Sequence, residues 1–175
     1  MTAGPPRTRM RVLGIDPSLN STGFGVIDYS SNHYSVVTHG MIKPSRSLPF
    51  PQRILTIKTG IEELIQKYGP QEVAIENLFH AHNIKTALAL GQVRGAALVA
   101  VAGNDCELFE YSALEIKKAV TGYGQAGKDQ VQHMVRILLH MPDEKLGNDA
   151  SDALACAICH LNARIFQQMI TAKEE

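Results

Sequence analysis

This chain of 175 residues is 45% hydrophobic and 19% charged, which favours a single folded domain with a continuous apolar core. Its 17 basic and 17 acidic residues cancel to a net charge of +0, which excludes a protein that coats nucleic acid by charge alone. No apolar run approaches about 18 residues, and residues 1–10 lack the apolar stretch of a secretory signal. We therefore expect a cytoplasmic protein without a membrane span, in which the three cysteines stay reduced.

Residues 1–9 include glycine, prolines and basic residues, which predicts a disordered leader. One folded domain is expected over residues 10–170, followed by a short tail at 171–175. Runs of branched and aromatic residues predict five strands, of which the first three follow one another closely enough to form an antiparallel meander. The expected strands cover residues 11–15, 23–29, 34–42, 73–75 and 107–111.

Apolar residues at helical spacing predict the helices, and capping residues and breakers mark their ends. The expected helices cover residues 51–68, 83–103, a short stretch after Ser112, 128–140 and 148–169. Strands come first, and strands and helices then alternate. The sequence therefore predicts an α/β fold in which helices flank both faces of a five-stranded mixed sheet.

Two acidic residues stand directly after apolar strands, where another apolar side chain would be expected. Asp16 follows residues 11–15, and Glu76 follows residues 73–75. Functional sites in α/β sheets commonly lie at the carboxyl ends of strands, so these two carboxylates are candidate functional groups. An Asx-turn that stabilises the bend before Pro17 is the alternative role for Asp16.

Two further acids, Asp149 and Asp152, are three residues apart at the start of the last expected helix. Small residues continue on their side of the helix, which would let that side lie close to the sheet and bring both aspartates toward the strand ends. The alternative is that the two aspartates only complement the helix dipole. The small residues are Cys156, Cys159 and Ala163, and the opposite apolar stripe is Leu154, Ile158, Leu161 and Ile165.

Four carboxylates in one place would repel one another unless divalent cations neutralised them. Oxygen ligands without imidazole or thiolate suit Mg²⁺ or Mn²⁺. Two such ions, about 4 Å apart, can activate a water and stabilise the leaving oxygen in phosphodiester cleavage. The acids therefore predict a metal-dependent nuclease with Asp16, Glu76, Asp149 and Asp152 as its catalytic metal ligands.

Several segments, in the same order, resemble motifs of the RuvC family of Holliday-junction resolvases, and together they span roughly residues 10–165. The segments are residues 12–18 (VLGIDPS), 22–26 (TGFGV), 74–79 (AIENLF), 90–95 (LGQVRG), 128–135 (KDQVQHMV) and 149–155 (DASDALA). The number and order of these motifs make the resemblance highly specific.

The resemblance implies a homodimeric, RNase H-like endodeoxyribonuclease that resolves four-way DNA junctions in recombination and repair. It would make paired symmetrical nicks that leave 5′-phosphate and 3′-hydroxyl ends, using two metal ions held by the four acids. Some family members have histidine at the position of Asp149. A branch-migration helicase complex is the implied protein partner. The resemblance implies that Phe79 stacks on opened bases and that Lys117 and Lys128 lie near the DNA backbone. Lys118, from the local excess of positive charge, and Arg94, in the LGQVRG segment, are further candidate DNA contacts.

Three of these features have a second interpretation from the residues alone. The lysines at 117, 118 and 128 form either a phosphate-binding surface or a solvated helix face. Phe79 either stacks on a base or packs as a lid over the core. The helix over 83–103 is rich in alanine and glycine, so it either pairs with a second copy across a two-fold axis or packs closely on its own sheet.

Other functions are less well supported by the sequence. A Gly-Ile-Asp strand end also occurs in sugar-kinase and actin-like proteins, but those need two related domains, and 175 residues are too few. Residues 156–160 fit the Cys-x-x-Cys-His pattern of haem attachment, but they lie inside the last expected helix among packing residues, so we expect no haem. A junction-binding protein that does not cut is a further alternative, which the complete set of acids disfavours.

Overall fold

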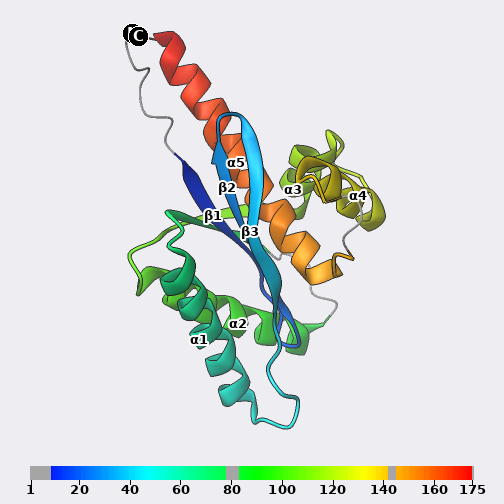
Figure 1. Ribbon diagram of the computed structural model, residues 1–175. Helices are drawn as coiled ribbons and strands as arrows, with labels where there is room; N and C mark the ends of the chain where they lie inside the picture. The colour runs from blue at the N-terminus through cyan, green and yellow to red at the C-terminus, as the bar shows by residue number, and fades with distance from the viewer. Residues whose placement is uncertain (1–8, 78–82, 142–144, 175) are drawn as a thin grey trace.

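The computed structural model describes residues 9–77, 83–141 and 145–174, and helices flank both faces of its five-stranded sheet (Figure 1). The strands are β1 (Met10–Asp16), β2 (Thr22–Ser30), β3 (His33–Ile42), β4 (Glu72–Asn77) and β5 (Glu107–Ser112). Their order across the sheet is β3-β2-β1-β4-β5. The first three strands are antiparallel, whereas β4 is parallel to both β1 and β5. The predicted meander and mixed α/β sheet are confirmed.

The helices of the described residues begin close to their expected positions. They are α1 (Phe50–Tyr68), α2 (Ile84–Ala102), α3 (Ala113–Thr121), α4 (Lys128–Leu138) and α5 (Asn148–Glu174). The side chain of Asn83 accepts a hydrogen bond from the Thr86 N–H and caps α2, while Ser112 and Glu115 form a capping box at α3. The last helix is longer than expected and continues through residues 171–174, which were assigned to a tail. Those residues favour helix, and no glycine or proline stops it.

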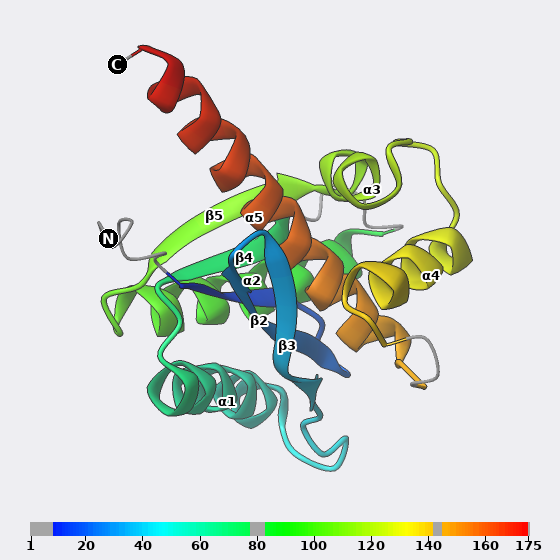
Figure 2. The ribbon, with the colours of Figure 1, turned by 45° about the horizontal axis from the view of Figure 1, so that its top comes forward.

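The side chains of the two inner strands alternate between two core layers, as the period of two in a strand requires. Leu13 and Val73 pack in the layer formed with α1 and α2, whereas Val12 and Ala74 pack in the layer formed with α3, α4 and α5. Figures 1 and 2 show these two groups of helices on opposite sides of the sheet. Asp16 has the same parity as Val12, so its side chain belongs to the α5 face.

Glycines in β1 and β2 allow α5 to lie very close to the sheet. A Cβ atom added at Gly14 would lie 2.0 Å from the backbone oxygen of Ala153 and 2.9 Å from the backbone nitrogen of Ala157, and one at Gly23 would lie 1.9 Å from the backbone oxygen of Asp149. The expected close approach is present: the backbone of Ala153 and Ala157 lies against Gly14, and Cys156 is buried in the same layer. The apolar stripe on the opposite side of the helix is also covered: Leu154, Ile158 and Leu161 are buried, as are all residues from 153 to 161.

Among the described helices, α2 is long and apolar enough by length and composition to cross a membrane, with a mean hydropathy of 1.3. It was not expected from the sequence because Lys85, Gln92 and Arg94 interrupt its apolar run. In this fold α2 packs against α1 and β5, and Val93 and Ala97 are buried in the core layer on that side of the sheet.

Candidate active site

Two carboxylates meet at the carboxyl edge of the parallel pair β1 and β4. The register pairs Ile15 with Ile75, so Asp16 and Glu76 follow as neighbours on adjacent strands. Ala74, two residues before Glu76, packs in the α5 layer, so the side chains of both acids belong to the α5 face. The parallel pairing of β1 and β4 is therefore what brings these two acids together.

The N-terminal part of α5 adds a third carboxylate, and α3 and α4 add two amines. Asp16, Glu76 and Asp152 line one cavity of about 260 Å³ together with Lys117 of α3 and Lys128, the first residue of α4. The Lys128 Nζ lies 3.7 Å from the Asp152 Oδ2, and the Lys128 side chain is 80% exposed. The remaining lining residues are apolar, namely Ala113, Ile116, Val131 and Ala155. The cavity thus combines three carboxylates, two lysine amines and an apolar wall.

The carboxylates carry negative charge that the protein does not fully neutralise. Burial, followed by the charges of Glu76, Asp152 and Asp149, raises the pKa of Asp16 to about 7. Burial and then Asp152 raise the pKa of Glu76. Burial also raises the pKa of Asp152, although Lys128 opposes the shift. Such a cluster favours any ligand that brings positive charge into the cavity.

The donor chemistry of the cavity fits a hard divalent cation. Its carboxylates are oxygen ligands. Burial raises the pKa of the nearby Cys156 thiol well above its usual value, so the thiol keeps its proton and is a poor ligand. Within residues 9–77, 83–141 and 145–174, no three acidic, histidine or cysteine side chains already stand close enough to enclose an ion. To bind an ion, the carboxylate side chains must therefore move closer together. Their mutual repulsion opposes this movement until a cation neutralises their charge.

Asp149 lies beside this cavity but does not line it. Its charge acts on Asp16 and Asp152, and its backbone oxygen lies against Gly23 of β2. Three residues along a helix correspond to about 300°, so Asp149 points roughly 60° away from Asp152. The structure thus groups three of the four predicted acids and places the fourth at the margin.

The predicted DNA contacts divide into those at the cavity and those elsewhere. Lys117 and Lys128 line it, whereas Lys118 is exposed on α3 and outside the lining. Arg94 is not at the cavity, because it forms an ion pair with Glu110 of β5 on the face covered by α2. Phe79 lies outside the described residues, so its stacking role stays a prediction.

The Cys-x-x-Cys-His segment forms part of the buried core of α5. Cys156 and Cys159 are free thiols buried in the α5 layer. His160 is fully buried and bonded through both ring nitrogens, to Tyr111 and Glu72. Sequence reasoning missed this polar cluster, because its partners lie far apart in the chain and no local spacing connects them.

Asp16→Asn is expected to stabilise the metal-free protein at neutral pH. Because the pKa of Asp16 is raised to about 7 in the folded state from 3.8, ionisation destabilises the fold. This loss of folding free energy is absent below about pH 4, grows as the pH rises to 7 and is constant above pH 7. Partial solvation lowers the effect, so we expect a gain of about 1–2 kcal/mol at pH 8. Urea unfolding of both proteins in EDTA at pH 4 and pH 8 measures it; an equal gain at both pH values would contradict this electrostatic origin.

Comparison with known proteins places these features in one family. The sequence profile of the family described as crossover junction endodeoxyribonuclease RuvC matches residues 12–160. The chain is 45% identical over 161 residues to the RuvC of Geotalea uraniireducens, covering 92% of this chain and 94% of that protein. It is 48% identical over 153 residues to the RuvC of Cupriavidus necator, covering 87% and 84%.

Solved structures show the same fold. Thermus thermophilus RuvC, in complex with a Holliday junction substrate, superimposes with a TM-score of 0.83 at 29% identity and covers 89% of this chain and 94% of that one. The yeast mitochondrial Holliday junction resolvase Ydc2 matches with a TM-score of 0.68 at 11% identity, covering 98% and 88%, which is a likeness of fold alone. These neighbours confirm the expected RNase H-like architecture.

Proposed function

Because the chain belongs to the RuvC family of crossover junction endodeoxyribonucleases, we propose that it resolves four-way DNA junctions by paired, metal-dependent nicks. The observation that carries this proposal is the cavity in which Asp16, Glu76 and Asp152 meet Lys117 and Lys128. Carboxylates for hard cations beside amines for phosphate are the groups that phosphodiester hydrolysis needs. The related Thermus protein was solved with a Holliday junction substrate, which supports the same substrate here.

The proposed roles follow from the position of each side chain. Asp16, Glu76 and Asp152 would hold two Mg²⁺ or Mn²⁺ ions, with Asp149 at the margin as a fourth ligand. When bound, such ions would lower the pKa of a water and stabilise the leaving oxygen. With the 3′ oxygen as the leaving group, the products would have 5′-phosphate and 3′-hydroxyl ends. Lys117 and Lys128 would orient the phosphate. Lys128 is exposed and close to Asp152, so it is also our candidate for protonating the leaving oxygen.

We further propose that α2 forms the dimer contact. Three large apolar side chains of this helix are strongly exposed: Ile84 is 78% exposed, Leu88 64% and Val99 60%. A Cβ atom added at Gly91 or Gly95 would meet nothing within 4 Å, so these glycines do not serve packing on their own sheet. A second copy could therefore approach this stripe closely. Two active sites related by a two-fold axis would then face opposed strands of the junction.

Leu88→Glu is expected to convert the dimer to a monomer. Two copies of the charge would be buried across the two-fold axis, so we expect the dimer dissociation constant to rise by at least about 30-fold, or about 2 kcal/mol. The control is Leu55→Glu on α1, which alters a leucine of similar exposure, 57%, away from α2. Sedimentation at micromolar concentration measures the state of each protein. A monomeric wild type, or a dimeric Leu88→Glu variant, would contradict this contact.

Two expectations from the sequence stay predictions. Association with a branch-migration helicase complex rests on the family resemblance, and cytoplasmic location rests on the sequence and on the proposed DNA substrate. Neither is needed for the cleavage assay.

Cleavage of defined substrates tests the proposed function. Purified protein is incubated with a labelled mobile four-way junction or with linear duplex of the same sequences, each in Mg²⁺, Mn²⁺ or EDTA. We expect symmetrical nicks in the junction only, and only with metal, with ends that ligase seals. Binding of the junction without nicks in either metal would indicate a junction-binding protein, and equal cutting of linear duplex would indicate a nuclease without structural selectivity. Either result would overturn the proposal.

A further inference from the structure

A second cluster of buried polar side chains lies about two helical turns along α5 from the cavity. His160 of α5 is fully buried, and its Nδ1 lies 2.8 Å from the Tyr111 hydroxyl of β5. Its Nε2 is hydrogen-bonded to the Glu72 carboxylate of β4. Glu72 also accepts a hydrogen bond of 3.0 Å from the Nε of Arg164, one turn further along α5. The cluster therefore joins α5 to the neighbouring parallel strands β4 and β5 by directional bonds.

The protonation states of Tyr111, His160 and Glu72 determine which atom donates and which accepts in each hydrogen bond. Burial raises the pKa of Tyr111 to about 12, so its hydroxyl stays protonated and donates a hydrogen bond to the His160 Nδ1. Burial lowers the pKa of His160, although Glu72 opposes the shift, so the ring is neutral and its Nε2–H donates to Glu72. Burial pushes the pKa of Glu72 upward, but hydrogen bonds from Arg164 and His160 outweigh it and lower the pKa, so the carboxylate is ionised.

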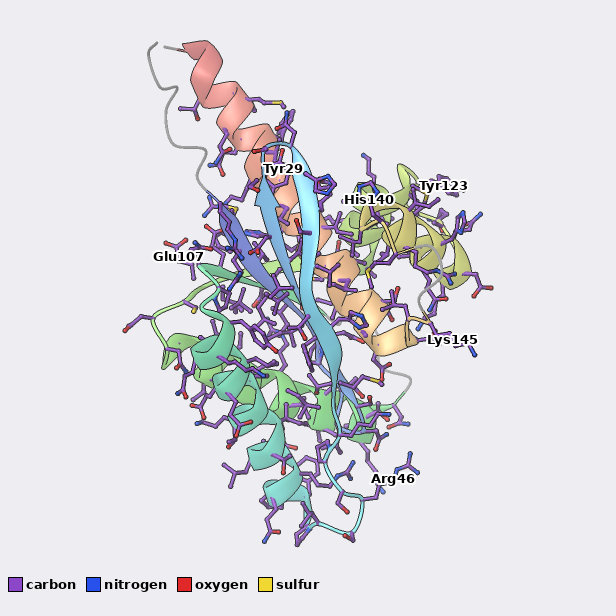
Figure 3. The ribbon with its side chains drawn as sticks, in the orientation of Figure 1. Tyr29, Arg46, Glu107, Tyr123, His140 and Lys145 are labelled. Carbon is purple, nitrogen blue, oxygen red and sulfur yellow. The ribbon has the colours of Figure 1, made fainter. Side chains whose placement is uncertain are left out.

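Aromatic contacts also connect residues of this cluster. The Phe109 ring lies 4.5 Å from the His160 ring, and the Arg164 guanidinium lies 4.7 Å from the Phe109 centroid. The Arg164 Nη2 also lies 3.6 Å from the Glu107 carboxylate, at the edge of the sheet where Figure 3 labels Glu107. His160 thus contacts Glu72 of β4 and both Phe109 and Tyr111 of β5, which restrict the movement of its ring.

The spacing of the cluster matches the spacing of the active-site acids. Along α5, Asp152 and His160 are eight residues apart, which is about 12 Å of helix. Along β4, Glu72 and Glu76 are four residues apart, which is about 13 Å of strand. Because His160 lies beside Glu72, and Asp152 shares a cavity with Glu76, helix and strand run antiparallel with nearly equal spans between their two contacts.

Between these two contacts, α5 meets the sheet mainly through small side chains. Ala153, Cys156 and Ala157 are buried there, and Gly14 of β1 lies directly beneath the alanines. Packing of small apolar groups is not directional, so it fixes the distance of the helix from the sheet more firmly than its position along its own axis. A directional hydrogen bond at one end can fix that axial position.

We propose that His160 is a positioning residue: by bridging Glu72 and Tyr111, it sets the axial position of α5 so that Asp152 lies opposite Glu76. This inference rests on the proposed function, because it concerns the metal-binding acids of that site. A shift of α5 by a fraction of a turn would separate Asp152 from Glu76.

The test compares His160→Gln and Tyr111→Phe with a packing control, Ile158→Ala, which removes a buried apolar side chain of α5 that forms none of the hydrogen bonds of the cluster. Mn²⁺ binding without DNA is measured by the rise in melting temperature on titration with Mn²⁺ alone. Junction binding in EDTA and single-turnover cleavage at saturating junction are measured on the same samples. Glu72→Gln and the double variant with His160→Gln extend the series should Tyr111→Phe prove too mild.

We expect His160→Gln to need about 10-fold more Mn²⁺ for half-saturation and to cut at least about 10-fold more slowly, with junction binding unchanged. Tyr111→Phe should show a smaller change of the same kind, and excess Mn²⁺ should restore part of the rate. Ile158→Ala should lower the melting temperature while keeping the wild-type Mn²⁺ requirement. A wild-type Mn²⁺ requirement in folded His160→Gln, or the same shift in Ile158→Ala, would overturn the inference. Failure of the wild type to cut would instead refute the proposed function.

Discussion

Junction cleavage is expected to fall by roughly 10³-fold or more in Asp16→Asn and in Glu76→Gln, while binding to the junction stays within about two-fold of wild type. Both changes keep the shape of the side chain and remove one negative charge from the cavity that Asp16, Glu76 and Asp152 share. The loss therefore reports on cation binding and not on packing. Gel-shift binding in EDTA and single-turnover cleavage in Mg²⁺ and Mn²⁺ measure the two properties separately.

Glu62→Gln is the matched control, because Glu62 pairs with Lys58 on the surface of α1. It should cut at the wild-type rate. Undiminished cleavage by Asp16→Asn or Glu76→Gln would remove these residues from the proposed metal site. Loss of junction binding in parallel with cleavage would show that the acids hold the fold or the DNA instead.

Gly14→Ala is expected to lower the free energy of unfolding by at least about 3 kcal/mol and to abolish cleavage in whatever protein remains folded. The added methyl group would lie 2.0 Å from a backbone oxygen of α5, which cannot rotate away as a flexible side chain would. The helix must move outward, and it carries Asp152 with it.

Urea unfolding measures the loss, with Gly147→Ala as the control, since a Cβ at Gly147 would meet only the end of Met41 at an ordinary 3.7 Å. We expect that control to remain within about 0.5 kcal/mol of wild type. If Gly14→Ala were as stable as Gly147→Ala, the close seating of α5 on the sheet would be wrong.

Much of the fold followed from local sequence signals. Strands in this chain have clear runs of branched residues, and caps such as Asn83 and Ser112 mark the helix starts, so element positions were predictable. Asp16 and Glu76 could be paired in advance because each ends an apolar strand, and two parallel strands bring such ends to one edge. The polar residues at the end of α5 favour a tail from the sequence alone, but the helix continues to Glu174 because nothing there breaks it.

The remaining details of the site depend on how α5 is rotated about its axis and on contacts between residues far apart in the sequence. Helical spacing put Asp149 next to Asp152, but it did not say which of the two would point into the cavity, because that depends on how α5 is turned on the sheet. The resemblance placed Arg94 in a motif, yet only the fold shows its ion pair with Glu110. Glu72 and His160 are 88 residues apart, and no local pattern connects them.

The order of the chain also governs when the enzyme becomes active during its synthesis. Asp16 belongs to the first strand and Asp152 to the last helix of the described fold, and the parallel partner of β1 lies beyond both β3 and α1. A nascent polypeptide that has not yet released α5 from the ribosome lacks both the third acid and the helix that covers the sheet. The cavity that Asp16, Glu76 and Asp152 share is therefore complete only once α5 has left the ribosome and packed on the sheet.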